Sequence, residues 1–413
     1  MALVDLTDWL DLNTVEGSIW YIKRLSGNDT LANGSHQAGP YTPNRLIFDV
    51  FPQFDTSDTL NPDIWLNLYI DSHSDHRSVR LVYYNNRRSK PGGTRNESRI
   101  TNLGGIASPL LDPESTGALA AFVFRPGDEG KMDCFVWVCG HATEEDVIEE
   151  RLGINVDPGR YVIWKPGEGL SFIGFATTSA ASDPCDLAPA SIPPDWLSKF
   201  PTGADIIAKA VALKKVTGMN PDKRLLARRD CEYKIFQSIE TAFFEPKIVG
   251  PFSSLKEFLD LAQSILQARK TRGGKSLELH VKEVLSEEKF VSGTDYSYAP
   301  VIECGKKPDF IFPSKAAYDD PAFAAGRLRM LGAKTTVKDR WRQIINEADR
   351  IPVKHLITLQ EGVSEAQFSE MRAAGVHLVV PFDLHETYPK SVRPHLITLE
   401  GFLGDLRAHT LTP

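Results

Sequence analysis

The sequence has few cysteines and no long apolar stretch. Its five cysteines are scattered over 413 residues, and no two of them have CxxC spacing. This pattern indicates neither a disulfide framework nor a zinc knuckle, and it predicts reduced cysteines with structural roles. No apolar run approaches about 18 residues, and the segment MALVDLTDWLDL lacks the basic and apolar regions of a secretory signal. We therefore expect a cytoplasmic protein.

Disorder and a single small domain are also excluded. Hydrophobic residues make up 42% of the chain and charged residues 24%, which is typical of a globular protein that can bury a core. A length of 413 residues is more than twice the usual size of one domain, roughly 150 residues. The sequence therefore predicts two domains.

The formal net charge of −7 shows no overall excess of basic residues, but the charge is distributed unevenly. Residues 77–99 contain seven Arg and Lys side chains and one acid, Glu97. Residues 327–342 contain six basic side chains and one acid, Asp339. The phosphates of a nucleic acid respond to the local electric field of a protein surface and not to the net charge of the chain. These two basic clusters are therefore compatible with nucleic acid binding. An ordinary solvated basic face is the alternative interpretation of the first cluster.

The first part of the chain has the pattern of an antiparallel β domain. Short β-rich runs alternate with segments rich in turn residues. These runs cover residues 46–51, 64–70, 79–84, 118–124 and 134–139. Residues 176–199 are rich in Ala, Ser and Pro without a periodic apolar pattern, so we expect a linker there. The predicted N-terminal domain, a barrel or sandwich, covers residues 1–175.

Residues 200–413 have the pattern of an α/β domain. Helical periodicity predicts a first group of elements: helices over 204–215, 228–244 and 254–270, a turn at Gly273-Gly274, and a helix over 275–290 with an apolar stripe of Leu277, Val281, Val284 and Leu285. Alternating elements follow: strands at 308–312, 327–335, 354–359 and 376–380, and helices at 338–350 and 364–375. The last helix should end at Gly375 as a C-cap.

Two residues at predicted strand ends suggest a site for phosphodiester hydrolysis. Asp309 opens the strand PDFIF and Lys334 closes the strand RLRMLGAK, so neighbouring strands could place them side by side. A carboxylate can hold a divalent cation, and an ammonium group can polarise water or phosphate. The arrangement resembles the core of PD-(D/E)xK nucleases, although Gly332 stands where a second acid is usual. Glu347, on the helix that follows, and Glu278 could supply the missing carboxylate.

Each of these residues also has an ordinary structural interpretation. A Pro-Asp pair is common by chance, and Lys334 could be a solvated lysine at a strand end. Glu347 could pair with Arg350, three residues later on a surface helix. Glu278 could have no role beyond a favourable interaction with the helix dipole near a helix N-terminus. The geometry at the strand ends decides between these interpretations.

Longer phrases resemble a known family. The catalytic domain of EcoRII-type restriction endonucleases is similar to KSLELH, KKPDFIFPS, LRMLGAKTT, KDRWRQIINEADR and LITLQEGVSEAQFSEMRAAGVHLVVP. The N-terminal domain of the same family is similar to YIKRLSGNDT, GSHQAG, TRNESRIT and SPLLDPESTGALA. The resemblance therefore covers nearly the whole chain.

The resemblance implies a prokaryotic, homodimeric type IIE enzyme with a C-terminal α/β restriction-endonuclease-like domain. Such an enzyme hydrolyses double-stranded DNA at CCWGG, where W is A or T, requires Mg²⁺, and belongs to a restriction-modification system with its own DNA methyltransferase. Asp309 and Glu347 would bind the metal, and Lys334 would be the catalytic lysine. Glu278 would be an additional acid. The residues that read bases would follow the lysine: Lys338, Asp339 and Arg340.

The same resemblance implies that residues 1–175 form a β-pseudobarrel of the B3 type. This domain would bind a second copy of the site as effector and otherwise inhibit the catalytic domain. Its DNA-facing residues would be Lys23, His36, Tyr41, Arg95, Glu97 and Arg99. Gly93 and Ser98 stand where we expect more basic residues. The alternative function is that of a sequence-specific DNA-binding regulator with an inactive nuclease core, which the glycine at position 332 suggests.

Overall fold

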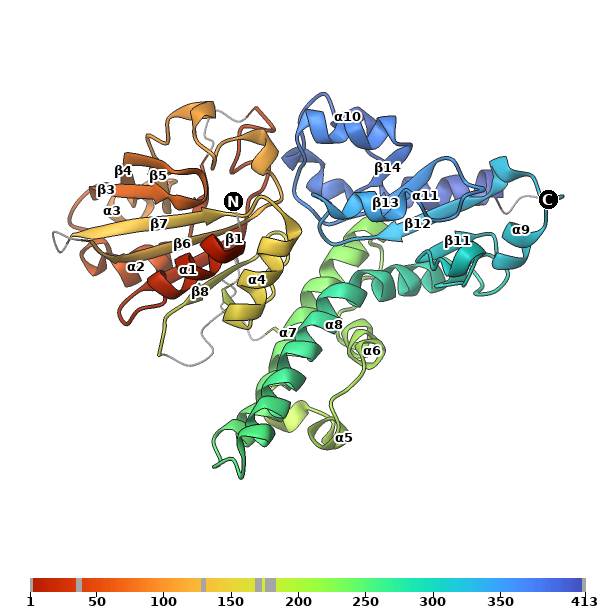
Figure 1. Cartoon of the computed structure of the whole chain (residues 1–413), viewed down its shortest axis with the longest axis horizontal. Coiled ribbons are helices and arrows are strands. Elements are labelled where there is room, and N and C mark those ends of the chain that lie inside the picture. The colour runs from red at the N-terminus through yellow and green to blue at the C-terminus, as the bar shows by residue number, and fades with distance from the viewer. Residues whose placement is uncertain (1–2, 35–38, 128–130, 168–172, 175–182, 411–413) are drawn as a thin grey trace. The chain divides into compact units, whose positions relative to one another are not determined.

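The computed structural model describes residues 3–34, 39–127, 131–167, 173–174 and 183–410. The chain forms two compact units (Figure 1). Unit 1 contains Met1–Thr177, Gln360–Glu370 and Glu386–Pro394, and unit 2 contains Thr178–Leu359, Met371–His385 and His395–Pro413. Within the described ranges, no helix combines the length and the apolar composition needed to cross a membrane.

Unit 1 is built on a nine-stranded sheet with the order β2-β5-β4-β3-β7-β6-β1-β8-β9. Neighbouring strands are antiparallel except for β3 and β7, which are parallel. The strands are β1 (Ile19–Arg24), β2 (Tyr41–Thr42), β3 (Asp63–Ile70), β4 (Asp75–Tyr84), β5 (Glu97–Thr101), β6 (Leu119–Pro126), β7 (Met132–Val138), β8 (Tyr161–Trp164) and β9 (Ile173–Gly174). The helices of this part are α1 (Leu3–Asn13), α2 (Asn44–Val50), α3 (Asn86–Ser89) and α4 (Ala142–Leu152).

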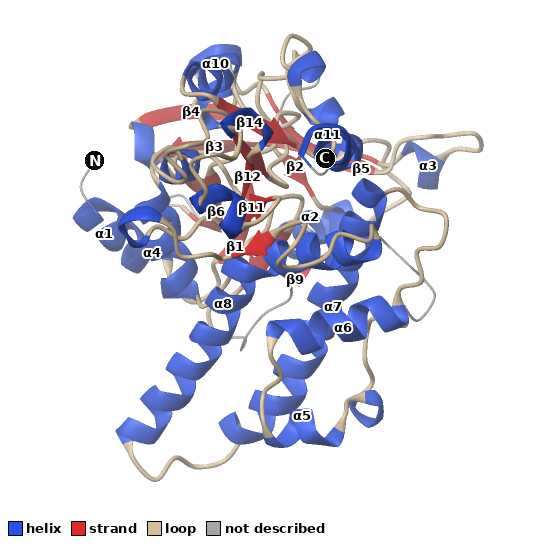
Figure 2. Cartoon of the chain, turned by 90° about the vertical axis from the view of Figure 1, so that its right-hand side faces the viewer, coloured by secondary structure: helices blue, strands red, loops and turns tan. Residues whose placement is uncertain are grey.

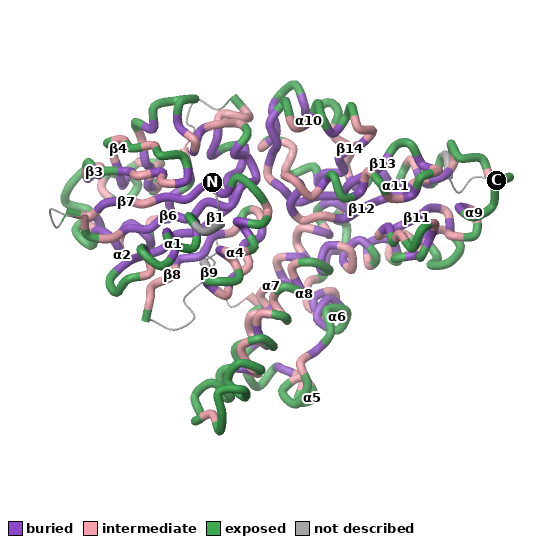
Figure 3. Tube along the Cα trace, in the orientation of Figure 1, coloured by how far each residue is buried: buried purple, intermediate pink, exposed green. Residues whose placement is uncertain are grey.

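Strand β1 shows how unit 1 buries both faces of this sheet. Ile19 and Tyr21 pack in one apolar cluster, and Trp20 and Ile22 pack in another. Because alternate side chains of a strand point to opposite faces, both faces are covered. Helices α1 and α4 contribute to the cluster around Trp20, whereas α2 contributes to the cluster around Tyr21. Strand β1 is therefore buried along its whole length (Figure 3).

The β-rich run predicted at residues 46–51 is wrong, because residues 46–50 lie in helix α2. Leu46, Ile47 and Val50 are buried on this helix and pack in the core of unit 1. A short apolar run of this length fits a buried helix and a buried strand equally well. Only the packing inside unit 1 distinguishes the two.

Unit 2 contains a five-stranded sheet with the order β10-β11-β12-β13-β14. The first three strands are antiparallel, and β12, β13 and β14 are parallel. The strands are β10 (Ser297–Tyr298), β11 (Phe310–Phe312), β12 (Arg329–Ala333), β13 (Lys354–Ile357) and β14 (Val376–Val379). The helices that follow residue 183 are α5 (Pro194–Ser198), α6 (Gly203–Leu213), α7 (Pro221–Ile248), α8 (Leu255–Glu287), α9 (Lys315–Asp319), α10 (Glu365–Ala373) and α11 (Leu399–Asp405).

Helices α7 and α8 run side by side, with α6 next to them (Figures 1 and 2). The apolar stripe predicted on residues 275–290 is buried and packs with Phe310 of the sheet. Gly375 has a φ of +74°, and its N–H donates to the carbonyl of Arg372 at 3.0 Å. The predicted C-cap and the predicted α/β architecture are therefore confirmed.

Helix α8 continues through Gly273-Gly274, so the turn predicted there is wrong. Residues on both sides of the glycines bind Glu232 of α7. Nε of Arg272 is 3.2 Å from Oε1 of Glu232, and Oγ of Ser276 donates to Oε2 of Glu232 at 3.1 Å. A glycine inside a helix costs about 1 kcal/mol, and these buried charged contacts keep the helix continuous.

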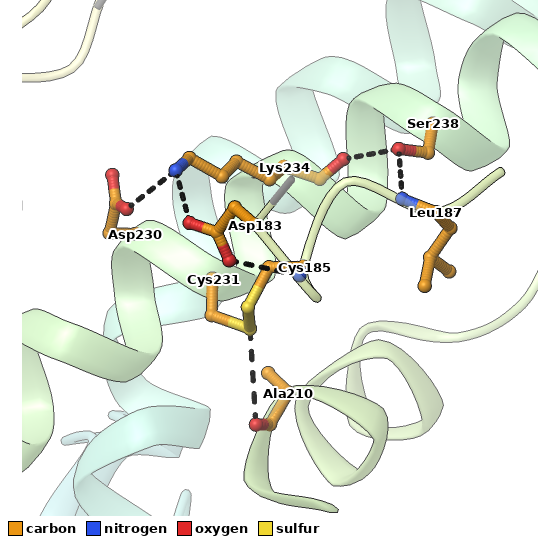
Figure 4. The surroundings of a disulfide bond; sticks show 8 residues. All are labelled: Asp183, Cys185, Leu187, Ala210, Asp230, Cys231, Lys234 and Ser238. Carbon is orange, nitrogen blue, oxygen red and sulfur yellow. Dashed lines mark hydrogen bonds and ion pairs between the residues drawn. A yellow bond between two sulfur atoms is a disulfide. The ribbon is translucent and has the colours of Figure 1, made fainter. Parts of the chain in front are cut away.

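Cys185 and Cys231 form a disulfide (Figure 4), so the prediction that all cysteines are reduced is wrong for this pair. Cys231 lies on α7, and Cys185 lies 46 residues earlier, before α5. Nζ of Lys234 is 2.6 Å from Oδ2 of Asp183, which anchors the same segment beside α7. The fold brings the two thiols together, and no local sequence motif records that proximity.

Breaking this disulfide should lower the stability of the protein. In the chain-entropy account, a crosslink that closes a loop of 46 residues contributes roughly 4 kcal/mol. We expect Cys185→Ser to lower the free energy of unfolding by roughly 2–4 kcal/mol, and dithiothreitol to do the same to the wild type. Urea unfolding with and without reductant measures both effects. Cys304→Ser, at an exposed free cysteine, is the matched control and should change neither curve. Equal wild-type curves with and without reductant would contradict the crosslink.

Candidate active site

The two strand ends that carry the predicted chemistry lie next to each other. Strands β11 and β12 are antiparallel, with Phe310 opposite Leu331. Asp309 directly precedes β11 and Lys334 directly follows β12, so both residues lie at the same edge of the strand pair. Nζ of Lys334 is 3.8 Å from Oδ2 of Asp309. An acid and an amine therefore share one edge of the sheet.

The backbone holds both residues in place. The N–H of Ala333 donates to Oδ2 of Asp309 at 2.7 Å. The N–H of Lys334 donates to the carbonyl of Ile357, on β13, at 3.0 Å. The side chain of Asp309 is 15% exposed and that of Lys334 is 25% exposed. The pair is thus fixed by the sheet and still accessible to a ligand.

A second carboxylate, Glu347, lies within electrostatic reach of this pair. Burial and the negative charge of Asp309 raise the pKa of Glu347 to about 7, whereas Lys334 and Lys354 lower it. Two acids that repel each other in a partly buried place bind a divalent cation more favourably than either acid alone. The charges of Asp309 and Lys334 therefore both act on Glu347.

Glu347 does not lie on a helix, so the helix predicted over 338–350 is wrong beyond its first turns. A 3₁₀ helix covers only Arg340–Ile344. Ala348 has a left-handed φ of +50°, which no helix accommodates. The buried amine of Lys354 donates to the carbonyl of Ala348 at 2.8 Å and holds this turn. A contact from the next strand thus sets the position of the second acid.

Arg350, the predicted structural partner of Glu347, is engaged elsewhere. Its guanidinium donates to the carbonyls of Asp320 and Phe323, each at 2.9 Å. These bonds tie the segment after Glu347 to the loop that follows α9. Arg350 therefore binds backbone carbonyls and not the carboxylate of Glu347.

Packing explains why residue 332 is glycine. A Cβ at this position would lie 2.9 Å from Cγ2 of Ile344 and 3.5 Å from Cδ1 of Leu356. The first distance is shorter than real Cβ contacts allow, so Ile344 fills the space where an acidic side chain would begin.

Glu278 lies well inside α8, so the interpretation as a residue of a helix N-terminus is wrong. Burial and the charge of Asp309 raise the pKa of Glu278, whereas a hydrogen bond from Tyr298 and the charge of Lys334 lower it. The O–H of Tyr298 donates to Oε2 of Glu278 at 3.0 Å. The charges of Asp309 and Lys334 therefore act on two further predicted acids, Glu278 on helix α8 and Glu347 in a turn.

The acids of this group fit a hard divalent cation. Mg²⁺ prefers oxygen ligands and usually takes one or two carboxylates from a protein, while water and phosphate complete its shell. Burial and the charge of Asp309 disfavour the ionised forms of Glu278 and Glu347 and raise the pKa of each, and a bound cation would offset both effects. Among the residues that the structure describes, no three acidic, histidine or cysteine side chains form a metal cluster by themselves.

The three residues predicted to read bases lie just after the strand-end lysine. Asp339 precedes Arg340, which is the first residue of the 3₁₀ helix, and Lys338 comes directly before them. All three residues are partly exposed. Oδ1 of Asp339 is 3.7 Å from NH1 of Arg342. They occupy the short connection between Lys334 and the turn that carries the second acid.

In unit 1, the predicted DNA-facing residues Arg95, Glu97 and Arg99 form one ionic row. They alternate along and just before β5, so they share one face of the strand. NH2 of Arg95 is 2.7 Å and NH2 of Arg99 is 3.1 Å from the carboxylate of Glu97. Burial by itself would raise the pKa of Glu97, but hydrogen bonds from the two arginines lower it overall. The row is about one third exposed.

The remaining predicted DNA-facing residues of unit 1 are Tyr41, Lys23 and His36, and the first two differ in exposure. Tyr41 is 45% exposed and lies opposite Arg99 in the pairing of β2 with β5, so it extends the ionic row. Lys23 does not lie on the surface as predicted, because its ammonium group is buried 2.6 Å from Oδ2 of Asp29. His36 lies outside the described residues.

Positions 93 and 98, where the sequence leads us to expect basic residues, are constrained by packing. A Cβ at Gly93 would lie 2.0 Å from the carbonyl oxygen of Asn86. Ser98 is buried, and its hydroxyl donates to Oδ1 of Asn44 at 2.8 Å. A long basic side chain therefore fits neither position in this fold.

Sequence reasoning missed two supporting residues of the site, Tyr298 and Lys354. No sequence spacing links Tyr298 to Glu278, which lies 20 positions earlier. Only the pairing of β10 with β11 could have indicated that Tyr298 comes near the site. Lys354 carried one weak signal, because it is a basic residue at the start of a strand that ends in Leu356 and Ile357.

The geometry defines the class of the C-terminal domain. An acid and a lysine at adjoining ends of two antiparallel strands, with further acids beside them and parallel strands beyond, form the core of a PD-(D/E)xK nuclease. The family described as "EcoRII C terminal" matches residues 236–403, and the one described as "Restriction endonuclease EcoRII, N-terminal" matches residues 14–168. The chain belongs to the EcoRII family of type II restriction endonucleases, which are site-specific deoxyribonucleases. The predicted combination of a β-pseudobarrel and an α/β nuclease domain is confirmed.

Two relatives illustrate the extent of the similarity. The chain is 42% identical to the type II restriction enzyme EcoRII of Escherichia coli over 403 residues, which cover 97% of this chain and 96% of the relative. It is 23% identical to the type II restriction enzyme SsoII of Shigella sonnei over 209 residues, which cover 45% of this chain and 67% of that relative. The similarity to EcoRII therefore includes both domains.

Two solved structures are similar to parts of the chain. One is metal-depleted Ecl18kI in complex with uncleaved, modified DNA, with a TM-score of 0.42 and 21% identity over 54% of this chain and 85% of that chain. The other is the B3 domain of the UbaLAI restriction endonuclease with cognate DNA, with a TM-score of 0.28 and 18% identity over 38% of this chain and 98% of that chain.

Proposed function

We propose that this protein hydrolyses double-stranded DNA at a CCWGG-like site in a Mg²⁺-dependent reaction, as a type IIE restriction endonuclease. The observation that carries the proposal is the pairing of Asp309 with Lys334 at one edge of the unit 2 sheet. The charge of Asp309 also acts on Glu278 and Glu347. The membership of the chain in the EcoRII family supports the same reaction.

Each residue of the group has a chemical role in this proposal. Asp309 and Glu347 offer carboxylate oxygens to the cation, and Lys334 places a positive charge beside the phosphate and the attacking water. Bound Mg²⁺ would neutralise the negative charge that develops on the phosphate. Glu278, whose pKa is raised, is an additional acid that can bind a proton or a water molecule. The group thus provides the charges that phosphodiester hydrolysis requires.

The connection after Lys334 suits the reading of bases. Arg340 and Lys338 can donate to O6 and N7 of guanine, and Asp339 can accept from N4 of cytosine. These residues lie four to six positions after Lys334. Recognition of the site and positioning of the lysine therefore depend on one short segment.

The N-terminal domain, in our proposal, binds a second copy of the site as effector and inhibits the catalytic domain until it does so. The row of Arg95, Glu97 and Arg99 beside Tyr41 supports this role, because it offers donors for guanine and an acceptor for cytosine. We further propose a homodimer as the active form, because a nearly palindromic site presents two equivalent strands to two subunits.

Cleavage of defined DNA tests this function. A plasmid with several unmethylated CCWGG sites should be cut in the presence of Mg²⁺, and a plasmid without such sites should stay intact. Sequencing of the product ends reports the site and the position of the cut. Protein that leaves the first plasmid intact but still shifts a CCWGG duplex would be a DNA-binding regulator with an inactive nuclease core.

A further inference from the structure

Tyr298 lies beside the proposed active site and has no part in the roles assigned above. In the pairing of β10 with β11, it is opposite Phe310, the residue after Asp309. The N–H of Ala299 donates to the carbonyl of Asp309 at 2.8 Å. The segment that contains Tyr298 is therefore hydrogen-bonded directly to the backbone of Asp309.

Two residues of α8, one helical turn apart, contact the side chain of Tyr298. Its O–H donates to Oε2 of Glu278 at 3.0 Å, and Nζ of Lys282 is 5.3 Å from the centroid of its ring. The ring also packs against Phe310, with the two centroids 5.3 Å apart. Because the ring is held by both α8 and β11, its hydroxyl has a fixed direction toward Glu278.

We propose that Tyr298 is a positioning residue that holds the carboxylate of Glu278 in the active site. This inference rests on the proposed nuclease function and adds a residue to it. A hydrogen bond from a phenol to a carboxylate is charge-assisted and is stronger than a bond between neutral groups. It engages one oxygen of Glu278 and thereby fixes the plane in which the other oxygen lies.

The chemistry of the site favours a neutral donor at this position. Burial and the charge of Asp309 oppose the ionised form of Glu278 and raise its pKa, so the carboxylate needs an attractive partner to stay in place. A lysine or arginine would supply attraction but would also cancel negative charge that a cation requires. The phenol of Tyr298 supplies attraction and adds no charge, because burial and the neighbouring Glu278 raise the pKa of its hydroxyl.

Tyr298→Phe tests the proposal, since phenylalanine keeps the ring and removes only the hydroxyl. Single-turnover cleavage by the full chain with Mg²⁺ should slow roughly tenfold, which corresponds to about 1.4 kcal/mol. Affinity for a CCWGG duplex in Ca²⁺ should not change. Tyr296→Phe is the matched control, because Tyr296 is a buried tyrosine two positions earlier whose hydroxyl bonds to Ser292. This control should cleave at the wild-type rate.

A Glu278→Ala background shows whether Tyr298 acts through Glu278. Tyr298→Phe should slow cleavage in the wild-type background and cause no further loss in the Glu278→Ala background. Urea unfolding of the metal-free proteins gives a readout that is independent of cleavage. The urea midpoint should fall when Tyr298→Phe is made in the wild type, and it should fall less when the change is made in Glu278→Ala.

Several results would overturn the proposal. Tyr298→Phe could cleave at the wild-type rate, or it could slow cleavage equally in both backgrounds. A loss of DNA affinity in Ca²⁺ would mean that Tyr298 contacts DNA itself. Failure of the wild type to cut any CCWGG plasmid would instead remove the nuclease function. In that case the urea measurements would still decide whether Tyr298 holds Glu278.

Discussion

Replacing Asp309 by asparagine should lower the rate of DNA cleavage by at least about 10³-fold and leave binding of the site intact. Asparagine keeps the size of the side chain and can still accept the N–H of Ala333, which lies 2.7 Å from Oδ2 of Asp309. It removes the negative charge beside Lys334 and with it a carboxylate ligand for the cation. A loss of this size corresponds to about 4 kcal/mol, which is within what a metal ion contributes to a hydrolytic transition state.

Two assays separate chemistry from binding in this variant. Single-turnover cleavage with Mg²⁺ measures the rate, and a gel shift with Ca²⁺ measures affinity for the site. Asp319→Asn is the matched control, because Asp319 is an exposed acid at the end of α9 that pairs with Lys315. This control should cut at the wild-type rate. If Asp309→Asn cuts at the wild-type rate, then Asp309 is not the anchor of the metal.

The strand ends of the site could be predicted because their signals are local. Strand β11 is an apolar run that begins directly after Asp309. Strand β12 is apolar after Arg329 and ends directly before Lys334. A charged residue at the end of a buried strand lies at the edge of a sheet whatever the rest of the fold does. The apolar stripe of residues 275–290 could also be predicted from a local signal, because its helical period appears in the sequence itself.

The position of the second acid could not be predicted in this way. The periodicity of residues 338–350 favours a helix, but the helix ends at Ile344. Ala348 then takes a φ of +50°, and the amine of Lys354, from the next strand, binds its carbonyl. These are tertiary interactions, and tertiary context overrides local propensity. The sequence could therefore name Glu347 as a candidate but could not describe the turn that presents it.

Helix α8 and the disulfide show the same limit. Gly273-Gly274 predicts a turn from local conformational preference, whereas the buried pair of Arg272 with Glu232 keeps the helix continuous. Cys185 and Cys231 meet only because the segment before α5 packs on α7. In each case the residue that makes the stabilising contact is remote in sequence. The sequence alone therefore does not indicate the interaction.

Replacing Glu347 by glutamine should stabilise the metal-free protein at pH 8 and lower the rate of cleavage by at least about 10²-fold. Burial and Asp309 raise the pKa of Glu347 from 4.5 to about 7. A carboxyl group whose pKa is raised by folding contributes stability that is fully present below pH 4.5 and is lost as the pH rises through 7. The upper limit of this loss is about 3 kcal/mol, and partial exposure of the side chain reduces it to about 1–2 kcal/mol.

Urea unfolding in EDTA between pH 5 and pH 8 measures this effect. The stability advantage of Glu347→Gln should grow as the pH rises through 7 and level off about one unit above it, because the wild-type carboxyl group is then almost fully ionised. Glu370→Gln, at an exposed acid of α10, is the matched control and should follow the wild-type curve. Stabilisation by added Ca²⁺ should be larger for the wild type than for Glu347→Gln, since the cation neutralises the repulsion that the variant lacks. Equal stability of both proteins at pH 8 would mean that neither burial nor the charge of Asp309 disfavours the ionised form of Glu347, and it would contradict the raised pKa.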